Sequence, residues 1–85
     1  MKKMFNAKGS SFEMINLATA IVEMDGSVYE VSVEGLVTGA VAIFSDDICK
    51  VVGSARIPID ARSKRLVVEE VVTIFSQNRE AFSIA

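Results

Sequence analysis

The side chains that most often perform chemistry are scarce in this sequence. It has no histidine, and its one cysteine is Cys49. Histidine is the usual general base near neutral pH, so its absence excludes Ser-His-Asp and Cys-His catalysis and every zinc site that uses imidazole. A single cysteine excludes an intrachain disulfide and a CxxC motif. We therefore predict that the protein is not an enzyme and that it holds no metal ion and no cofactor.

The remaining candidates for chemistry have simpler explanations. The two acidic pairs are Asp46-Asp47 and Glu69-Glu70. Neighbouring side chains on a helix point about 100° apart, so neither pair converges on one substrate or ion. Asp46 and Asp47 instead suit the first turn of a helix, where the dipole favours negative charge. The glycines lack the GK[ST] ending of a phosphate loop. Cys49 is interpreted as a small buried hydrophobic residue.

Charge is segregated along the chain, although the net charge is only −2. Between Lys8 and Lys50 every charged residue is acidic: Glu13, Glu23, Asp25, Glu30, Glu34, Asp46 and Asp47. The segment 50–65 is mainly basic. Two interpretations remain open. The two parts either serve only to keep the protein soluble, or the acidic half docks on a basic partner by electrostatic steering.

The composition is apolar for so short a chain. Hydrophobic residues make up 51% and the mean hydropathy is +0.40. A small domain cannot bury so much apolar surface, so we expect a partner face or a homodimer formed through the long helix or an open sheet edge. No run approaches the roughly 20 apolar residues of a membrane span, so no membrane partner is expected. The lack of disulfides favours a reducing, cytoplasmic setting.

The chain is predicted to form a single domain, residues 1–85, of which residues 1–9 form a flexible N-terminal arm. Residues 12–24 are ambiguous, because Ser10 and Glu13 fit a helix capping box whereas the segment is rich in β-branched residues. Asp25-Gly26 is a strong signal for a two-residue hairpin turn. That turn would pair Met24 with Ser27, Val22 with Tyr29, Ala20 with Val31 and Ala18 with Val33.

The second half is predicted to contain more helix. A third strand is expected over 36–44 and a short helix over 46–52, begun by Ser45 and closed by Gly53. An edge strand over 56–59 would precede a long helix over 61–82, capped by Asp60 or Ser63. Its outward residues would be Glu69, Glu70, Thr73, Gln77 and Glu80. The predicted fold is α+β: a small antiparallel sheet of three to four strands, with a short helix and a long C-terminal helix packed on one face.

Two runs carry a resemblance. VYEVSVEGLVTGAVAIFSDDICKVVG and the later FSQNREAF resemble a family of short bacterial proteins with a hairpin, a small helix and a C-terminal helix. The resemblance covers about residues 28–85. It implies a fold and no activity.

The sequence therefore favours a non-enzymatic interaction protein. We expect a small inhibitor or regulator, of the kind that phages and mobile elements encode, which binds a protein partner with a basic surface. The contact would be an acidic sheet face with a hairpin at its tip. Its predicted partner-binding residues are Glu23, Asp25, Glu30 and Glu34.

The alternative is a small nucleic-acid-associated regulator that uses the basic segment 56–65. Its candidate residues are Arg56, Arg62, Lys64 and Arg65. Phosphates could there meet both cationic side chains and the amides of a helix N-terminus. A pI of about 5.0 and the few aromatic residues weigh against this alternative.

Overall fold

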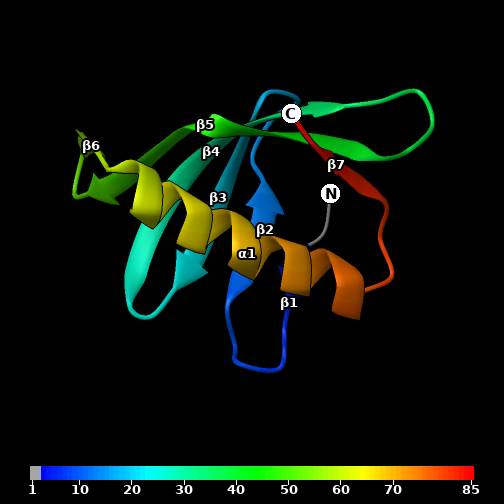
Figure 1. Ribbon diagram of the computed structural model, residues 1–85, viewed down its shortest axis with the longest axis horizontal. Coiled ribbons are helices and arrows are strands. Elements are labelled where there is room, and N and C mark those ends of the chain that lie inside the picture. The colour runs from blue at the N-terminus through cyan, green and yellow to red at the C-terminus, as the bar shows by residue number, and fades with distance from the viewer. Residues whose placement is uncertain (1–2) are drawn as a thin grey trace.

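The computed structural model describes residues 3–85, which form a seven-stranded sheet with one helix lying across it (Figure 1). The strands are β1 (Met4–Phe5), β2 (Ser11–Met14), β3 (Thr19–Met24), β4 (Ser27–Gly35), β5 (Val41–Val52), β6 (Ala55–Pro58) and β7 (Phe82–Ile84). The helix is α1 (Ala61–Gln77). Within residues 3–85 no helix is long and apolar enough to cross a membrane.

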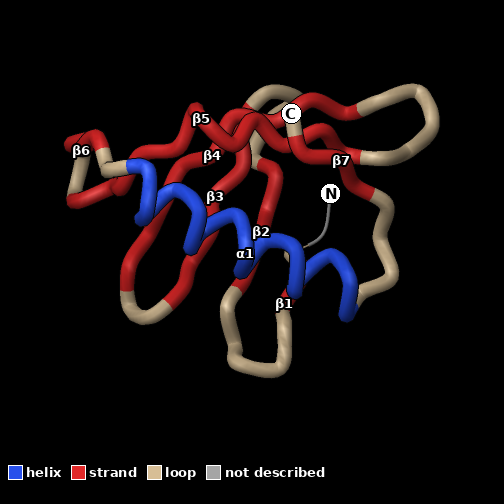
Figure 2. Tube along the Cα trace, in the orientation of Figure 1, coloured by secondary structure: helices blue, strands red, loops and turns tan. Residues whose placement is uncertain are grey.

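The first six strands form an antiparallel meander in which each strand pairs with the next (Figure 2). The long strand β5 pairs along one side with β4. Its other side is shared, because β6 pairs antiparallel with its second half and β7 pairs parallel with its first half. Helix α1 follows β6 and crosses one face of the sheet, where it contacts β1, β2, β3 and β5. No helix of residues 3–85 covers the opposite face of the sheet.

The core lies between α1 and the sheet. The ring of Phe12 in β2 meets the ring of Phe75 in α1 edge to face, with centroids 4.8 Å apart, and Phe82 in β7 packs on Phe75 at 5.6 Å. Such contacts add to the free energy gained from burying the rings. The other core residues alternate along the strands or follow a helical stripe: Met4, Ala20, Val22, Val31, Val33, Val41, Ile43, Ile48, Val67, Val71 and Ile74.

The predicted hairpin is confirmed. Strands β3 and β4 pair in the expected register, with Met24 opposite Ser27, Val22 opposite Tyr29 and Ala20 opposite Val31, while the fourth predicted pair, Ala18 with Val33, lies beyond the start of β3. Asp25 and Gly26 both have positive φ, at 50° and 74°. Two positive φ values fit a type I′ turn, whose twist matches that of the flanking strands.

The predicted strand number is wrong, because the N-terminal quarter of the chain adds strands to the sheet. Residues 12–24 contain strand β3 and most of β2, joined by a turn in which the side chain of Asn16 accepts a hydrogen bond from the Ala18 amide at 2.8 Å. Residues 3–9 of the expected arm supply β1 and the turn after it, and Met4 is buried. Residues 1 and 2 lie outside the described chain. Cross-strand packing of β-branched residues therefore outweighs the capping-box signal.

The predicted short helix over 46–52 is also wrong, and the strand predicted over 36–44 begins only at Val41. Residues 36–40 form a loop, and Val41–Val52 form the single strand β5. An isolated helix of seven residues is marginal, whereas β5 gains ladder hydrogen bonds on both sides. From Val31 to Val33 strand β4 advances two residues, while β5 goes from Ile48 back to Ile43, which is five. This bulge holds the polar residues that imitate a helix start.

Helix α1 begins as predicted but ends earlier. Asp60 is the N-cap, and its carboxylate accepts a hydrogen bond from the Ser63 amide at 2.7 Å. The predicted end at Phe82 is wrong, because Arg79 has a φ of 56° and turns the chain back toward β5. The Arg79 amide donates to the Ser76 carbonyl and the Glu80 amide to the Phe75 carbonyl, which is a Schellman motif. Glycine usually marks that position, and this chain has arginine there.

Replacing Arg79 by glycine should stabilise the protein. A left-handed conformation costs an L residue about 1–2 kcal/mol that glycine does not incur, so Arg79→Gly should raise the free energy of unfolding by up to about 1 kcal/mol. Urea titration measures the change. Glu69→Gly, at an exposed position inside the helix, is the control and should lower it by a similar amount. A destabilising effect of Arg79→Gly would contradict this geometry.

A polar network fastens the N-terminal turn to α1. Glu70 was predicted to face outward, and this is wrong, because it is 8% exposed. Its carboxylate accepts hydrogen bonds from the Ser10 hydroxyl at 2.5 Å and the Asn6 amide group at 3.0 Å. Lys8 lies 3.7 Å away. The hydrogen bonds from Ser10 and Asn6 lower the pKa of Glu70, against the opposing effect of burial.

This network predicts a pH-dependent part of the stability. Because the pKa of Glu70 is lower in the folded state, its contribution is present above the unfolded value of about 4.5 and is lost as the pH falls through the folded value. Glu70→Gln should lower the free energy of unfolding by about 1–3 kcal/mol at pH 7 and by less in acid. Urea titrations across that range measure the difference. Glu69→Gln, on the exposed neighbour, should have little effect at any pH. An equal loss at all pH values for Glu70→Gln would exclude this linkage.

Candidate interaction surface

The face of the sheet opposite α1, called here the outer face, gathers the acidic residues of the first half of the chain. Strand alternation places every second residue of β2 to β6 on it. The outer face comprises Glu13, Ile21, Glu23, Val28, Glu30, Ser32, Glu34, Asp47, Cys49, Val51 and Arg56. Three of the four predicted partner-binding residues therefore share one surface.

The register orders these residues into rows across the sheet. One row runs from Glu13 through Ile21, Glu30 and Cys49 to Pro58. A second row contains Ser11, Glu23, Val28, Val51 and Arg56. Each row mixes apolar side chains with carboxylates. The outer face is thus amphipathic rather than uniformly acidic.

Two of the predicted carboxylates form ion pairs on this surface. Lys3 Nζ lies 3.2 Å from Glu23 Oε2, and Arg56 Nε donates to Glu30 Oε2 at 2.9 Å. The hydrogen bond from Lys3 lowers the pKa of Glu23. Exposed pairs of this kind contribute only about 0–1 kcal/mol to stability, and salt screens them. They leave their carboxylates available for exchange with another cation.

Other acidic groups of the outer face have no such pairing. Among residues 3–85, neither Glu13 nor Glu34 forms a salt bridge. The Ser32 hydroxyl donates to Asp47 Oδ2 at 2.5 Å, a bond that leaves the charge of Asp47 uncompensated. Glu13 and Asp47 were not among the predicted site residues. Reading residues 11–14 as a strand would have placed Glu13 on this face, but nothing in the sequence shows the bulge that places Asp47.

The predicted partner-binding residues span the full length of the sheet. Asp25 sits at the turn between β3 and β4, and Glu34 lies near the opposite end of β4. At about 3.3 Å per residue the nine residues of β4 extend roughly 30 Å. Beside Asp25 a hollow of about 460 Å³ opens between the two N-terminal hairpins, lined by Lys8, Ser10, Glu23 and Asp25 among others. A set so widely spaced suits a macromolecule and not one small ligand.

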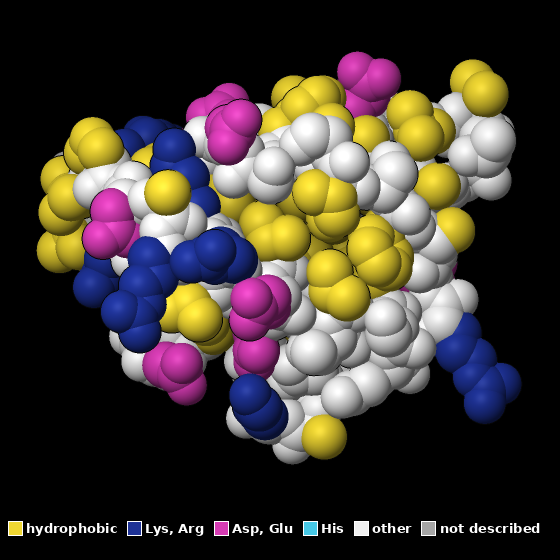
Figure 3. Space-filling view, in the orientation of Figure 1, with side chains coloured by type: hydrophobic (Ala, Val, Ile, Leu, Met, Phe, Trp, Pro, Cys, Tyr) yellow, Lys and Arg dark blue, Asp and Glu magenta, His cyan; other side chains and the backbone are white. Residues whose placement is uncertain are grey.

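The predicted nucleic-acid residues are divided between the two faces. Arg56 lies on the outer face, paired with Glu30, whereas Arg62, Lys64 and Arg65 belong to the first turns of α1 on the other face. Figure 3 shows the helix-bearing face, with Lys and Arg side chains concentrated on the side where α1 begins. The sheet therefore separates Arg56 from the other three.

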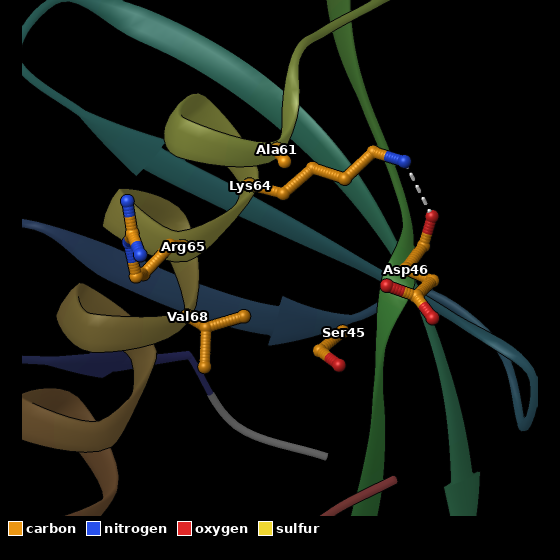
Figure 4. Close-up of a pocket in the computed structure, with 6 residues that line it drawn as sticks. All are labelled: Ser45, Asp46, Ala61, Lys64, Arg65 and Val68. Atoms are coloured by element: carbon orange, nitrogen blue, oxygen red, sulfur yellow. Dashed lines mark hydrogen bonds between the residues drawn. The ribbon is translucent and has the colours of Figure 1, made fainter.

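Lys64 has a structural task beside the bulge of β5. Neither β6 nor β7 reaches the middle of β5, and there Lys64 Nζ donates to the Asp46 carbonyl at 2.8 Å (Figure 4). An open cleft of about 310 Å³ lies at this gap, lined by Ser45, Asp46, Ala61, Lys64, Arg65 and Val68. Arg65 extends away from Asp46 in this view. Lys64, one of the three cationic residues of α1, therefore has a structural role in joining the helix to β5.

The described residues hold no arrangement suited to metal binding. Among residues 3–85 no three Cys, Asp or Glu side chains converge closely enough to hold a metal ion. Cys49 is half-buried in β5, between Glu30 and Pro58 in the ladder, and not in a helix. Burial raises the pKa of its thiol, and the neighbouring carboxylate of Glu30 adds to the effect. Its environment thus opposes formation of a nucleophilic thiolate.

Comparisons of the chain with protein-family models, with curated proteins and with solved structures give no significant match. The interpretation of the outer face therefore depends on the geometry described above.

The placement of Cys49 beside Glu30 predicts how its thiol reacts. Glu30→Gln removes a negative charge next to the sulfur and frees Arg56, so the pKa of Cys49 should fall and alkylation at neutral pH should become severalfold faster. Iodoacetamide labelling followed by mass spectrometry measures the rate. Glu69→Gln, on the exposed side of α1, should leave the rate unchanged. Equal rates for all three proteins would rule out the pairing of β4 with β5 in this register.

Proposed function

We propose that the protein is a non-enzymatic interaction protein, a small inhibitor or regulator that binds a protein with a basic surface through the outer face of its sheet. The observation that carries this proposal is that one face of the seven-stranded sheet has no helix of residues 3–85 over it and presents rows in which carboxylates and apolar side chains are mixed. Protein interfaces combine these two elements, since apolar contacts supply affinity and charges supply steering.

The dimensions of the outer face suit a protein partner. The molecule extends 32 Å and 25 Å along its two longer axes, which bounds a flat face at about 800 Å². A standard protein interface buries about that area on each partner. Its apolar members, chiefly Ile21, Val28 and Val51, lie in the two rows nearest the turn between β3 and β4, among Glu13, Glu23 and Glu30, and Glu34 lies at the other end of β4. Such a mixture of apolar and charged side chains is common in protein interfaces.

Charge favours a basic protein over nucleic acid. The outer face carries five carboxylates against Lys3 and Arg56: Glu13, Glu23, Glu30, Glu34 and Asp47. A phosphate backbone would be repelled by it. A protein whose own site is basic, including one that binds nucleic acid, would be attracted instead. As part of the same proposal we place the protein in the reducing cytoplasm, where an unstapled chain with one free thiol persists.

The test uses surface variants that leave the ion pairs intact. Glu13→Lys combined with Glu34→Lys reverses two charges of the outer face that hold no salt bridge within residues 3–85. Each protein is used as bait in its native host extract at low salt, and the captured proteins are quantified by mass spectrometry. We expect a basic protein captured by the wild type to fall at least tenfold with the double variant, a loss of about 1.4 kcal/mol in binding.

The matched control is Glu69→Lys combined with Glu80→Lys, which makes the same change in net charge on exposed positions away from the outer face. It should retain the captured protein. Equal loss from both double variants would show that net charge and not the outer face determines binding, and would refute the proposal. Retention on duplex DNA at about 50 mM salt, where phosphate contacts are strong, would favour the nucleic-acid alternative.

A further inference from the structure

Strand β7 leaves an open edge whose backbone groups are free to pair. Its hydrogen bonds to β5 use the Ala81 carbonyl and both the amide and carbonyl of Ala85. In a parallel ladder successive residues point to opposite sides, so Ser83 also faces β5, and the amides and carbonyls of Phe82 and Ile84 face away from it. Within residues 3–85 strand β7 pairs with β5 alone. Phe82 and Ile84 therefore present two backbone hydrogen-bond donors and two acceptors on the side of β7 away from β5.

The other two edges of the sheet have cations or proline that oppose pairing, whereas β7, which is three residues long, has neither. Edge strand β1 has only two residues and is flanked by Lys3. Edge strand β6 contains Arg56 and ends in Pro58, which has no amide hydrogen to donate. Short length, cations and proline are the usual means of preventing edge-to-edge association. Strand β7 has no charged residue and no proline.

The chain on the β5 side of β7 is also uncharged. Residues 81–85 and the adjoining segment 35–45 contain no Asp, Glu, Lys or Arg. Ile84 and Phe44 are exposed hydrophobic residues there, and Figure 3 shows hydrophobic side chains gathered between β7 and the second half of α1. A twofold contact sets each residue near its own copy, so charge on such a patch would repel itself. An apolar, uncharged edge is what a self-contact requires.

We infer that two copies of this chain associate through β7, with the two strands antiparallel about a twofold axis at Ser83. Phe82 of one copy then lies opposite Ile84 of the other, and each such pair exchanges two hydrogen bonds. The two Ser83 residues face each other as a non-hydrogen-bonded pair, with Cα atoms about 4.5 Å apart. The sheet continues from one copy into the next. The outer faces of both copies stay open, so this inference does not depend on the proposed function.

A cross-linking experiment tests the register directly. In a Cys49→Ser background, Ser83→Cys places one cysteine of each copy opposite the other. Their Cα atoms are then within the roughly 4.4–6.8 Å separation that a disulfide accepts. Paired strands hold these thiols at an effective concentration near millimolar, so mild oxidation should give a disulfide-linked dimer at least about tenfold faster than for Ser76→Cys, on the exposed side of α1. Equal rates for the two variants would overturn the inference.

Sedimentation of the otherwise unmodified chain gives the second test. We expect a concentration-dependent dimer with a Kd between about 1 μM and 1 mM, given the small interface. Ile84→Lys should shift the protein to monomer, while Leu66→Lys, an equally exposed apolar position on α1, should leave the dimer intact. A wild type that stays monomeric at about 1 mM, or a dimer lost with Leu66→Lys and kept with Ile84→Lys, would refute pairing through β7.

Discussion

One constraint underlies the structure of residues 3–85: a single helix of 17 residues covers a sheet of seven strands. A sheet is stabilised by burying one face, and α1 supplies that cover through Val67, Val71, Ile74 and Phe75. There is no second helix among the described residues for the other face. The sheet must therefore tolerate water there, and its alternating polar residues do so. The core, the location of the carboxylates and the open edges all follow from this asymmetry.

The long strand β5 determines the shape of the sheet around that core. Among the strands of residues 3–85 it alone has three partners, with β4 on one side and β6 and β7 sharing the other. Its bulge between Ile43 and Ile48 allows both residues to face the core although five positions separate them. At the same bulge the Asp46 carbonyl accepts a hydrogen bond from the Lys64 ammonium group of α1. A local irregularity is thus compensated by a residue distant in sequence.

The fold gathers acidic residues of the first half of the chain on one face and divides the basic residues of the segment 56–65 between two faces. Carboxylates from four strands share the outer face because side chains alternate along each strand and the register aligns the outward positions, and two of these carboxylates pair with Arg56 of β6 and with Lys3. The basic segment does not remain together. Arg56 lies on the outer face, whereas Arg62, Lys64 and Arg65 lie on the helix that covers the other face. The two groups separate because the chain crosses from one face to the other between Pro58 and Ala61.

The sequence by itself determined the local features whose causes are local. Asp25-Gly26 specifies its hairpin and register because only a few turns fit two residues with positive φ, and Asp60 caps α1 because its carboxylate reaches an amide three residues on. Tertiary structure decided the rest. The segment 45–52 resembles a helix start but forms strand because it pairs with neighbouring strands. Helix α1 ends before Arg79 without a glycine because Phe82 packs on Phe75. Glu70 points inward because Ser10 and Asn6 donate hydrogen bonds to its carboxylate. These outcomes depend on neighbouring strands, on the docking of β7 against α1, or on groups 60 or more positions away, and no local pattern of residues contains them.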